Sequence, residues 1–272
     1  MKRLPAPAKL NLALVVGPRR GDERHEVTTV LQRLDLADRI TVEPADRLTV
    51  SGFVGDTLVR AALERLAAAA GVEPRWRARI EKHIPVASGL GGGSSDAASA
   101  LSLANRTLPQ PLDSAALHEL AARLGADVPF FLQSGPALGS GAGDELERLE
   151  LPQDFYVLLL LPKGEAKGST AAVFAAFDAR GGEEGYAARR EAVLDALRTV
   201  RRPRDLAALP PNDLTSSPLA ERLLELGAFR ADVSGAGPML YGLFMQRAGA
   251  DRAARLLRSL GRTWTTVPAW YG

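Results

Sequence analysis

The most regular hydrophobic pattern lies near the start of the chain, where polar and apolar residues alternate over positions 8–16. The apolar positions are Leu10, Leu12, Leu14 and Val16. A period of two is typical of a half-buried β-strand. Such a strand brings the two polar side chains Lys9 and Asn11 together on its other face.

Similar patterns predict the other strands. We expect two short strands on either side of the turn at 45–47, a strand over 75–85, and buried or alternating strands over 154–162 and 262–270. The glycine-rich segment 227–244 predicts two strands joined by a turn.

Helical spacing of apolar residues predicts the remaining elements. One helix runs from Thr57 to the glycine at 71, and another begins with Asp113 as N-cap and ends at Gly125. Further helices are expected at 170–178, 186–199, 217–226 and 247–261. Strands and helices alternate in two halves that meet near residues 150–155, which predicts an α+β protein with lobes 1–153 and 154–272.

The composition indicates where the protein works and which kinds of partner it lacks. The chain has 272 residues, no cysteine and a formal net charge of +2. We expect a cytoplasmic protein without disulfides, and no apolar run is long enough to predict a membrane span. Its one dense basic cluster, at 198–205, is typical of a solvated helix end, so we expect no nucleic-acid partner.

The segment 85–100, PVASGLGGGSSDAASA, is a candidate ligand-binding loop. Glycines before a helix allow close approach to backbone N–H groups, which favour an anion such as phosphate. We expect Ser94 and Ser95 to add N-cap chemistry at the helix start. A Walker A loop is excluded, because no lysine occurs between Lys82 and Lys163, and Ser94 occupies the third glycine position of a dinucleotide fingerprint.

Three segments, at 5–14, 85–98 and 232–244, resemble the three signatures of the GHMP kinases in the same order. The resemblance implies a two-lobed fold, with an N-terminal lobe like ribosomal protein S5 domain 2 and a C-terminal ferredoxin-like lobe. It also implies ATP as the phosphoryl donor, with Mg²⁺, and a glycine turn of the third signature packed near the phosphate loop. The ATP-binding residues that it implies are Pro85, Val86, Ala87, Ser88, Gly89, Leu90, Gly91, Gly92, Gly93, Ser94 and Ser95.

Finer matches, including RRGDERHEV, LQRLDLADRI and LGADVPFFL, are similar to the branch of this family that phosphorylates the 2-hydroxyl of a cytidine-diphosphate-linked polyol in the non-mevalonate isoprenoid pathway. The chain departs from that branch at 23–25, where Glu-Arg-His replaces Gly-Tyr-His, and at 56–58, where Asp-Thr-Leu replaces Asp-Asn-Leu. A mevalonate- or homoserine-type kinase and a binding protein without catalysis are the alternatives.

The resemblance implies that Asp127 is the base on the acceptor hydroxyl and that Lys9 is its partner. From the residues alone, Asp127 follows a helix stop, and Pro129 predicts an extended Val128, so the carboxylate lies in a fixed loop beside a helix end. A turn-capping Asp127 and an edge-strand Lys9 that discourages aggregation are the alternatives.

The resemblance further implies that five residues bind the acceptor substrate: Asn11, Arg24, His25, Thr170 and Phe174. In this interpretation Phe174 and Arg24 lie against the pyrimidine, with Arg24 standing where the branch has a tyrosine. A solvated histidine, a threonine at a helix start and a core phenylalanine are the alternatives.

No acidic cluster in the sequence has metal-ligand spacing, so we assign no protein ligand to the metal. We expect a monomer or a homodimer whose partner is a small molecule. His83 and His118 are interpreted as structural, and the aromatic end at Trp270 and Tyr271 as a frayed tail.

Overall fold

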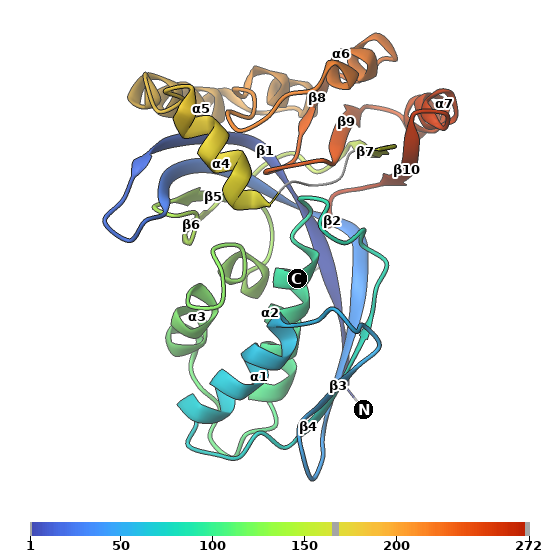
Figure 1. The fold of residues 1–272 in the computed structure, drawn as a ribbon. Helices are drawn as coiled ribbons and strands as arrows, with labels where there is room; N and C mark the ends of the chain where they lie inside the picture. Colours follow the sequence, from blue (N-terminus) through green and yellow to red (C-terminus); the bar gives the residue numbers. More distant parts are fainter. Residues whose placement is uncertain (1, 165–168, 270–272) are drawn as a thin grey trace.

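Two long antiparallel strands, β1 (Lys2–Arg19) and β2 (His25–Pro44), run through the whole molecule (Figure 1). The computed structural model describes residues 2–164 and 169–269. On the edge of β2 that faces away from β1, β4 (Trp76–Glu81) pairs with residues 39–44 and β5 (Ala137–Ser140) with residues 29–31, and β6 (Glu145–Arg148) pairs with β5. The short β3 (Thr49–Ser51) pairs with β4.

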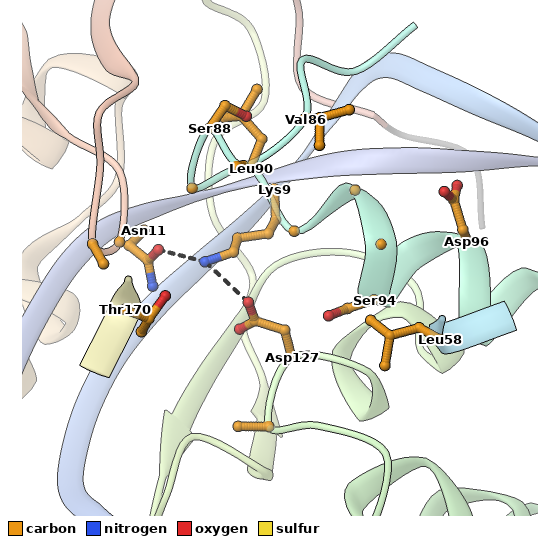
Figure 2. A pocket seen from close by; sticks show the side chains of 18 of the residues that line it. Lys9, Asn11, Leu58, Val86, Ser88, Leu90, Ser94, Asp96, Asp127 and Thr170 are labelled. Atoms are coloured by element: carbon orange, nitrogen blue, oxygen red, sulfur yellow. Dashed lines mark hydrogen bonds and ion pairs between the residues drawn. The ribbon is translucent and has the colours of Figure 1, made fainter. Parts of the chain in front are cut away.

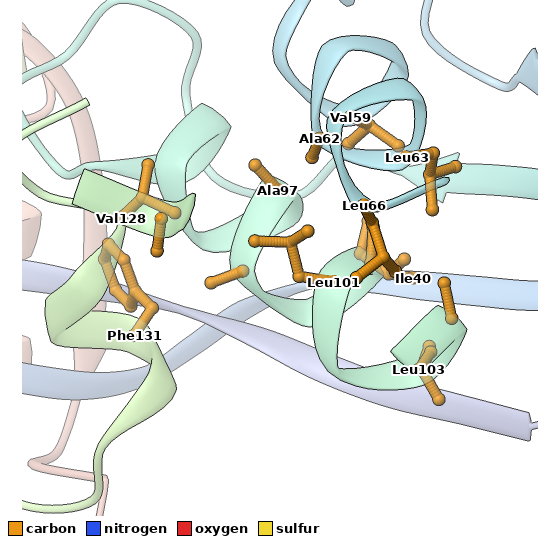
Figure 3. Packing of buried hydrophobic residues seen from close by; sticks show 14 of the residues in the cluster. Ile40, Val59, Ala62, Leu63, Leu66, Ala97, Leu101, Leu103, Val128 and Phe131 are labelled. Atoms are coloured by element: carbon orange, nitrogen blue, oxygen red, sulfur yellow. The ribbon is translucent and has the colours of Figure 1, made fainter. Parts of the chain in front are cut away.

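Helices of the first half pack on this sheet and form the first core. They are α1 (Leu58–Ala69), α2 (Gly92–Asn105), α3 (Ser114–Ala122) and the 3-10 helix η1 (Pro129–Leu132). Figure 3 shows Leu63 and Leu66 of α1 packed near Leu101 of α2 and Ile40 of β2. This packing holds the N-terminus of α2 in place beside β1.

The second half is built on a four-stranded sheet in the order β10-β7-β9-β8. Its strands are β7 (Tyr156–Pro162), β8 (Arg230–Val233), β9 (Leu240–Phe244) and β10 (Gly261–Thr266). Its helices are α4 (Thr170–Ala179), α5 (Tyr186–Thr199), the 3-10 helix η2 (Pro203–Ala208), α6 (Pro218–Glu225) and α7 (Arg247–Leu257). This α+β arrangement confirms the predicted fold class. None of the helices in the described ranges combines the length and apolarity that crossing a bilayer requires.

The strand predicted over 8–16 is buried on both faces, so its interpretation as half-buried is wrong. Leu10 and Leu12 are 0% exposed and pack in one core with Phe155 and Tyr241 of the second half. The opposite face carries Lys9, which is also buried. The boundary between lobes 1–153 and 154–272 stays a prediction, because this core draws on both halves.

The sheet contains pairings and strands that the sequence pattern does not predict. The strands flanking the turn at 45–47 do not pair with each other: β2 pairs with β4 in antiparallel register, whereas β3 pairs with β4 in parallel. Strand β4 therefore lies between them, since its alternating apolar face completes the sheet beneath α1 and α2. Strands β5 and β6 carry no strong alternation and were not predicted from the pattern.

A buried arginine joins the two halves. Arg230 is 6% exposed and donates hydrogen bonds to the carbonyl oxygens of Leu12, Leu206, Leu209 and Pro210. Its Nε also donates to the hydroxyl of Tyr241, 3.1 Å away. One guanidinium thus satisfies carbonyl groups of β1 and of the 206–210 segment, which strand pairing leaves without partners.

We expect Arg230→Ala to lower the free energy of unfolding by about 3 kcal/mol or more, because it leaves several buried carbonyls unpaired. Urea unfolding followed by circular dichroism measures this change. Arg222→Ala is the matched control: its side chain is 53% exposed and forms an ion pair with Glu225, so we expect a loss of less than about 0.5 kcal/mol. Equal effects of the two variants would contradict the assigned role.

Candidate active site

A cavity of about 530 Å³ lies where the N-terminus of α2 approaches β1 and the second half of the chain. Its wall includes residues 85–94, the side chains of Lys9 and Asn11, Asp127, and the start of α4 (Figure 2). The structure thus brings most of the predicted site residues together. Leu58 at the start of α1 and Gly235 from the turn between β8 and β9 complete two of its edges.

The glycine loop takes its shape from contacts with both halves of the chain. The N–H of Lys9 donates to the carbonyl of Leu90 at 2.9 Å, and the N–H of Met239 donates to that of Ser88 at 3.0 Å. Gly89 has φ +87°, and a Cβ there would lie 2.3 Å from the carbonyl oxygen of Ser234. This close approach confirms that the glycine turn of 234–237 packs against the loop.

Helix α2 begins two residues before the predicted serines. Gly91, in the left-handed conformation, is the N-cap, no side chain caps the helix, and the first turn contains no acidic residue. The prediction that Ser94 and Ser95 cap the helix is therefore wrong. Ser94 lines the cavity, whereas the hydroxyl of Ser95 is buried without a hydrogen-bond partner and does not line it. Uncapped N–H groups at this end leave a positive helix terminus facing the cavity.

Lys9, Asn11 and Asp127 form a connected polar group in the cavity (Figure 2). The Lys9 Nζ donates to the Asn11 Oδ1 at 2.6 Å and lies 3.4 Å from an Asp127 carboxylate oxygen. The Asn11 side chain is fixed in turn, since its Nδ2 donates to the Thr29 hydroxyl at 2.8 Å. The Lys9 side chain is 5% exposed and that of Asp127 is 39% exposed. The ammonium is therefore held inside while the carboxylate faces the cavity.

The backbone conformation that positions Asp127 differs from the prediction. Val128 has helical φ and ψ of −64° and −43°, so the extended backbone expected before Pro129 is wrong. The N–H of Val128 instead closes a turn on the carbonyl of Gly125 at 3.0 Å. Pro129 serves as the first residue of η1, where its missing N–H costs nothing.

The predicted acceptor-binding residues separate into two groups. Thr170 and Phe174 line the cavity. His25 is buried, its ring stacked on that of Phe174 at 4.8 Å between centroids, and its Nε2 lies 2.7 Å from an Asp178 carboxylate oxygen. Hydrogen bonds from Arg19 and His25 lower the pKa of Asp178. His25 thus reaches the cavity only through Phe174.

Arg24 does not line the cavity. Its guanidinium pairs with Asp22 at 2.7 Å and with Asp144 at 3.0 Å, and its side chain is 46% exposed. The hydrogen bonds that the guanidinium donates to Asp22 and Asp144 raise the pKa of Arg24. Both ion pairs direct the guanidinium away from the predicted position beside a pyrimidine.

Sequence reasoning missed a charged group behind the glycine loop. Lys82 bridges the carboxylates of Asp38 and Asp96, with 2.8 Å to Asp96. Burial raises the pKa of Asp96 to about 7, opposed by Lys82 and supported by the neighbouring Asp38. Asp96 lies within the second signature, in SSDAA, but nothing in the sequence pairs it with a residue of β2. In the described ranges, no group of three His, Asp or Glu side chains could hold a metal.

Comparisons with known proteins agree with this geometry. Residues 57–135 match the family model described as the N-terminal domain of GHMP kinases. The 4-diphosphocytidyl-2-C-methyl-D-erythritol kinase of Pelotomaculum thermopropionicum is 37% identical over 273 residues, which cover 93% of this chain and 92% of the relative. The enzyme of the same name from Anaeromyxobacter sp. is 38% identical over 281 residues, which cover 93% of this chain and 85% of the relative.

Solved structures give the same result. A crystal structure of 4-(cytidine 5'-diphospho)-2C-methyl-D-erythritol kinase matches with a TM-score of 0.79 and 33% identity, covering 98% of this chain and 99% of that one. A mevalonate kinase matches with a TM-score of 0.75 at 13% identity, over 98% and 99% of the two chains. The second likeness is one of fold alone.

We expect Gly89→Ala to lower the free energy of unfolding by about 2 kcal/mol or more, because the new methyl group meets the Ser234 carbonyl and alanine disfavours positive φ. Thermal or urea unfolding measures the loss. Gly125→Ala is the matched control, since the nearest atom to its new methyl is 3.6 Å away. A wild-type stability for Gly89→Ala would contradict the close packing of loop and turn.

Proposed function

Because this chain belongs to the 4-diphosphocytidyl-2-C-methyl-D-erythritol kinases, a branch of the GHMP kinases, we propose that its cavity transfers the γ-phosphoryl group of ATP to the 2-hydroxyl of that polyol. The reaction belongs to the methylerythritol phosphate route to isoprenoids. The observation that carries the assignment of the site is the Lys9–Asp127 pair, which faces the same cavity as the uncapped start of α2.

The glycine loop holds the triphosphate of ATP. The N–H groups of Gly92, Gly93 and Ser94 lie in the first turn of α2, where they have no partner within the helix, and the helix dipole favours negative charge. The cavity wall formed by residues 85–94 allows close approach, because four of these positions are glycines. Phe53 and Leu58 provide apolar surface beside the loop for the nucleoside.

In this proposal Mg²⁺ binds together with ATP. The described residues offer no cluster of three acids, whereas Mg²⁺ bound to ATP needs few protein ligands. Asp127 and Ser94 are among the oxygen-bearing side chains that line the cavity, and these two would hold the ion at the start of α2. It would supply charge compensation for the transferred phosphoryl group.

Asp127 acts as the base on the acceptor hydroxyl. As the acceptor oxygen attacks the γ-phosphorus, its proton passes to the Asp127 carboxylate and the bond to the ADP oxygen breaks. Lys9 stabilises the negative charge that develops on the attacking and transferred oxygens. Its ammonium can do so because Asn11 holds the Nζ, and the loop carbonyl of Leu90 holds the backbone N–H of Lys9, before substrate binds.

Side chains at the start of α4 bind the acceptor. Thr170 offers a hydroxyl and Phe174 an aromatic face for the cytosine, while Asn11 lies beside the reacting group. His25 supports Phe174 by stacking, and contact with the base requires a shift of α4. The assignment of Arg24 to the base requires that it leave its ion pairs with Asp22 and Asp144.

Two further proposals concern the protein as a whole. We retain a cytoplasmic location, supported by the cysteine-free composition, and a monomer or homodimer as its assembly. Neither is needed for the chemistry of the cavity.

The acceptor is tested by turnover of ATP with three alcohols: the cytidylylated methylerythritol, mevalonate and homoserine. We expect ADP formation with the first and a kcat/KM at least about 100-fold lower with the others, because they lack the base that Phe174 would contact. Phosphorus NMR of the product locates the new phosphate. Turnover confined to mevalonate or homoserine would exclude the proposed acceptor.

We expect Asp127→Asn to lower kcat by a factor of about 100 to 10,000 with little change in the KM for ATP, because the amide cannot accept the proton. Steady-state kinetics measure both quantities. Glu119→Gln on α3, which removes an exposed carboxylate, is the control and should leave kcat within about twofold. An unchanged rate in a folded Asp127→Asn variant would refute the mechanism.

A further inference from the structure

A β-bulge in β1 decides which side chains of this strand face the cavity. Residues 11 and 13 of β1 pair with the consecutive residues 31 and 30 of β2, which leaves Leu12 as an extra residue. Strict alternation would place Leu14 on the face opposite to Lys9, yet both side chains line the cavity. The bulge therefore shifts the alternation by one residue, as bulges beside active sites commonly do.

The buried hydroxyl of Thr29 lies next to this bulge. Thr29 is opposite Leu14 on β2 and is 3% exposed. Its hydroxyl donates to the carbonyl oxygen of Ala13 at 2.8 Å, which uses its one proton. Its oxygen accepts a hydrogen bond from Nδ2 of Asn11, also at 2.8 Å. Because a carbonyl can only accept, the directions of both hydrogen bonds are fixed by the backbone.

The same direction continues to the reacting groups. Oδ1 of Asn11 accepts from Nζ of Lys9 at 2.6 Å, and that Nζ lies 3.4 Å from a carboxylate oxygen of Asp127 (Figure 2). An ammonium has three N–H donors and a side-chain amide has two. Lys9 and Asn11 therefore each keep one N–H for a ligand, whereas the oxygen of the Asn11 amide is already occupied.

We propose that Thr29 is a positioning residue for phosphoryl transfer, because it holds the Asn11 amide with an N–H, and not the carbonyl oxygen, toward the acceptor alcohol. The inference rests on the proposed function. A hydroxyl oxygen that meets Lys9 and Asn11 can only accept hydrogen bonds from them, so its proton is directed to the Asp127 carboxylate. A rotated Asn11 would compete for that proton and would leave the Lys9 ammonium without one of its partners.

Other contacts hold Asn11 in place but do not fix the nitrogen end of its amide. The backbone N–H of Asn11 donates to Oγ of Ser234 at 3.3 Å. Gly235 packs against the oxygen end, since a Cβ there would lie 3.2 Å from Oδ1. Within residues 2–164 and 169–269, the hydrogen bond of Nδ2 is the one to Thr29. Loss of this hydroxyl would therefore leave a buried N–H unpaired beside the reacting groups.

The test compares Thr29→Val and Thr29→Ser in steady-state kinetics with ATP and the cytidylylated acceptor. Valine keeps the shape of threonine but cannot accept a hydrogen bond. We expect kcat of Thr29→Val to fall about 10-fold or more with the KM for ATP within about twofold, because the lost contact serves the reacting groups and not the nucleotide. Thr29→Ser keeps the hydroxyl and should retain kcat within about threefold.

Thr28→Val is the matched control, since it removes the hydroxyl of the neighbouring buried threonine. That hydroxyl lies 3.0 Å from the hydroxyl of Tyr186, and neither residue lines the cavity. Urea unfolding should show similar losses of stability for the two valine variants, whereas kcat of Thr28→Val should stay within about twofold of the wild type. Equal kcat values for the two valine variants, or no recovery in Thr29→Ser, would overturn the inference.

A double-mutant cycle tests whether Thr29 acts through Asn11. We expect Thr29→Val to change kcat by less than about twofold when Asn11→Ala is already present, because the group that the hydroxyl holds is then missing. An equal loss of kcat in both backgrounds would show that Thr29 affects the rate in another way, and it would overturn the proposal.

NMR of the side-chain amides separates this inference from the proposed function, because it needs no turnover. In isotope-labelled protein, the Nδ2 resonance of Asn11 is the one that Asn11→Ala removes. We expect exchange of its bound proton with water to be at least about 10-fold faster in Thr29→Val than in the wild type. Unchanged exchange would overturn the inference. A protected proton in a wild type that does not turn over ATP would instead refute the proposed function.

Discussion

The structure depends on the burial of one ammonium group, that of Lys9, on a strand that is covered on both faces. A buried charge is costly unless partners surround it, and here Asn11 and Asp127 are those partners, while the backbone N–H of Lys9 ties the strand to the loop carbonyl of Leu90. Each is held by a different part of the chain: Asn11 by Thr29 of β2, Asp127 by the turn before η1, and the loop by the turn at Ser234. Stabilising the ammonium and assembling the site are therefore the same event.

The glycine loop solves the problem of binding phosphate without a lysine of its own. Positive charge comes from the uncapped N-terminus of α2 and from Lys9, which arrives from a strand about 80 residues earlier in the chain. The glycines at 89 and 91 serve mainly to admit neighbours, the Ser234 carbonyl in one case and the stem of Lys9 in the other. The loop is thus shaped by packing against its surroundings as much as by its own flexibility.

The errors of the sequence-based predictions have physical causes. The strand over 8–16 has the alternation of a half-buried strand, yet a second core covers it, because alternation cannot distinguish solvent from a buried polar site. Ser94 and Ser95 have good N-cap residue types, but Gly91 adopts the left-handed conformation and starts the helix earlier. Pro129 disfavours a helical Val128 only locally, and the turn on Gly125 outweighs that preference. Strand β4 pairs with both strands that flank the turn at 45–47, and the local pattern carries no information on this order.

The sequence by itself determined the α+β class, most helices and the three motifs that imply an ATP-dependent kinase, because periodicity and glycine spacing are local properties. It also placed Lys9 and Asn11 on one strand face. Only the tertiary structure decided that Arg24 lies in ion pairs outside the cavity, that His25 stacks on Phe174, and that Asp38, Lys82 and Asp96 share one buried cluster. Such contacts join residues up to 149 positions apart, and their charges and burial follow from packing that no local pattern encodes.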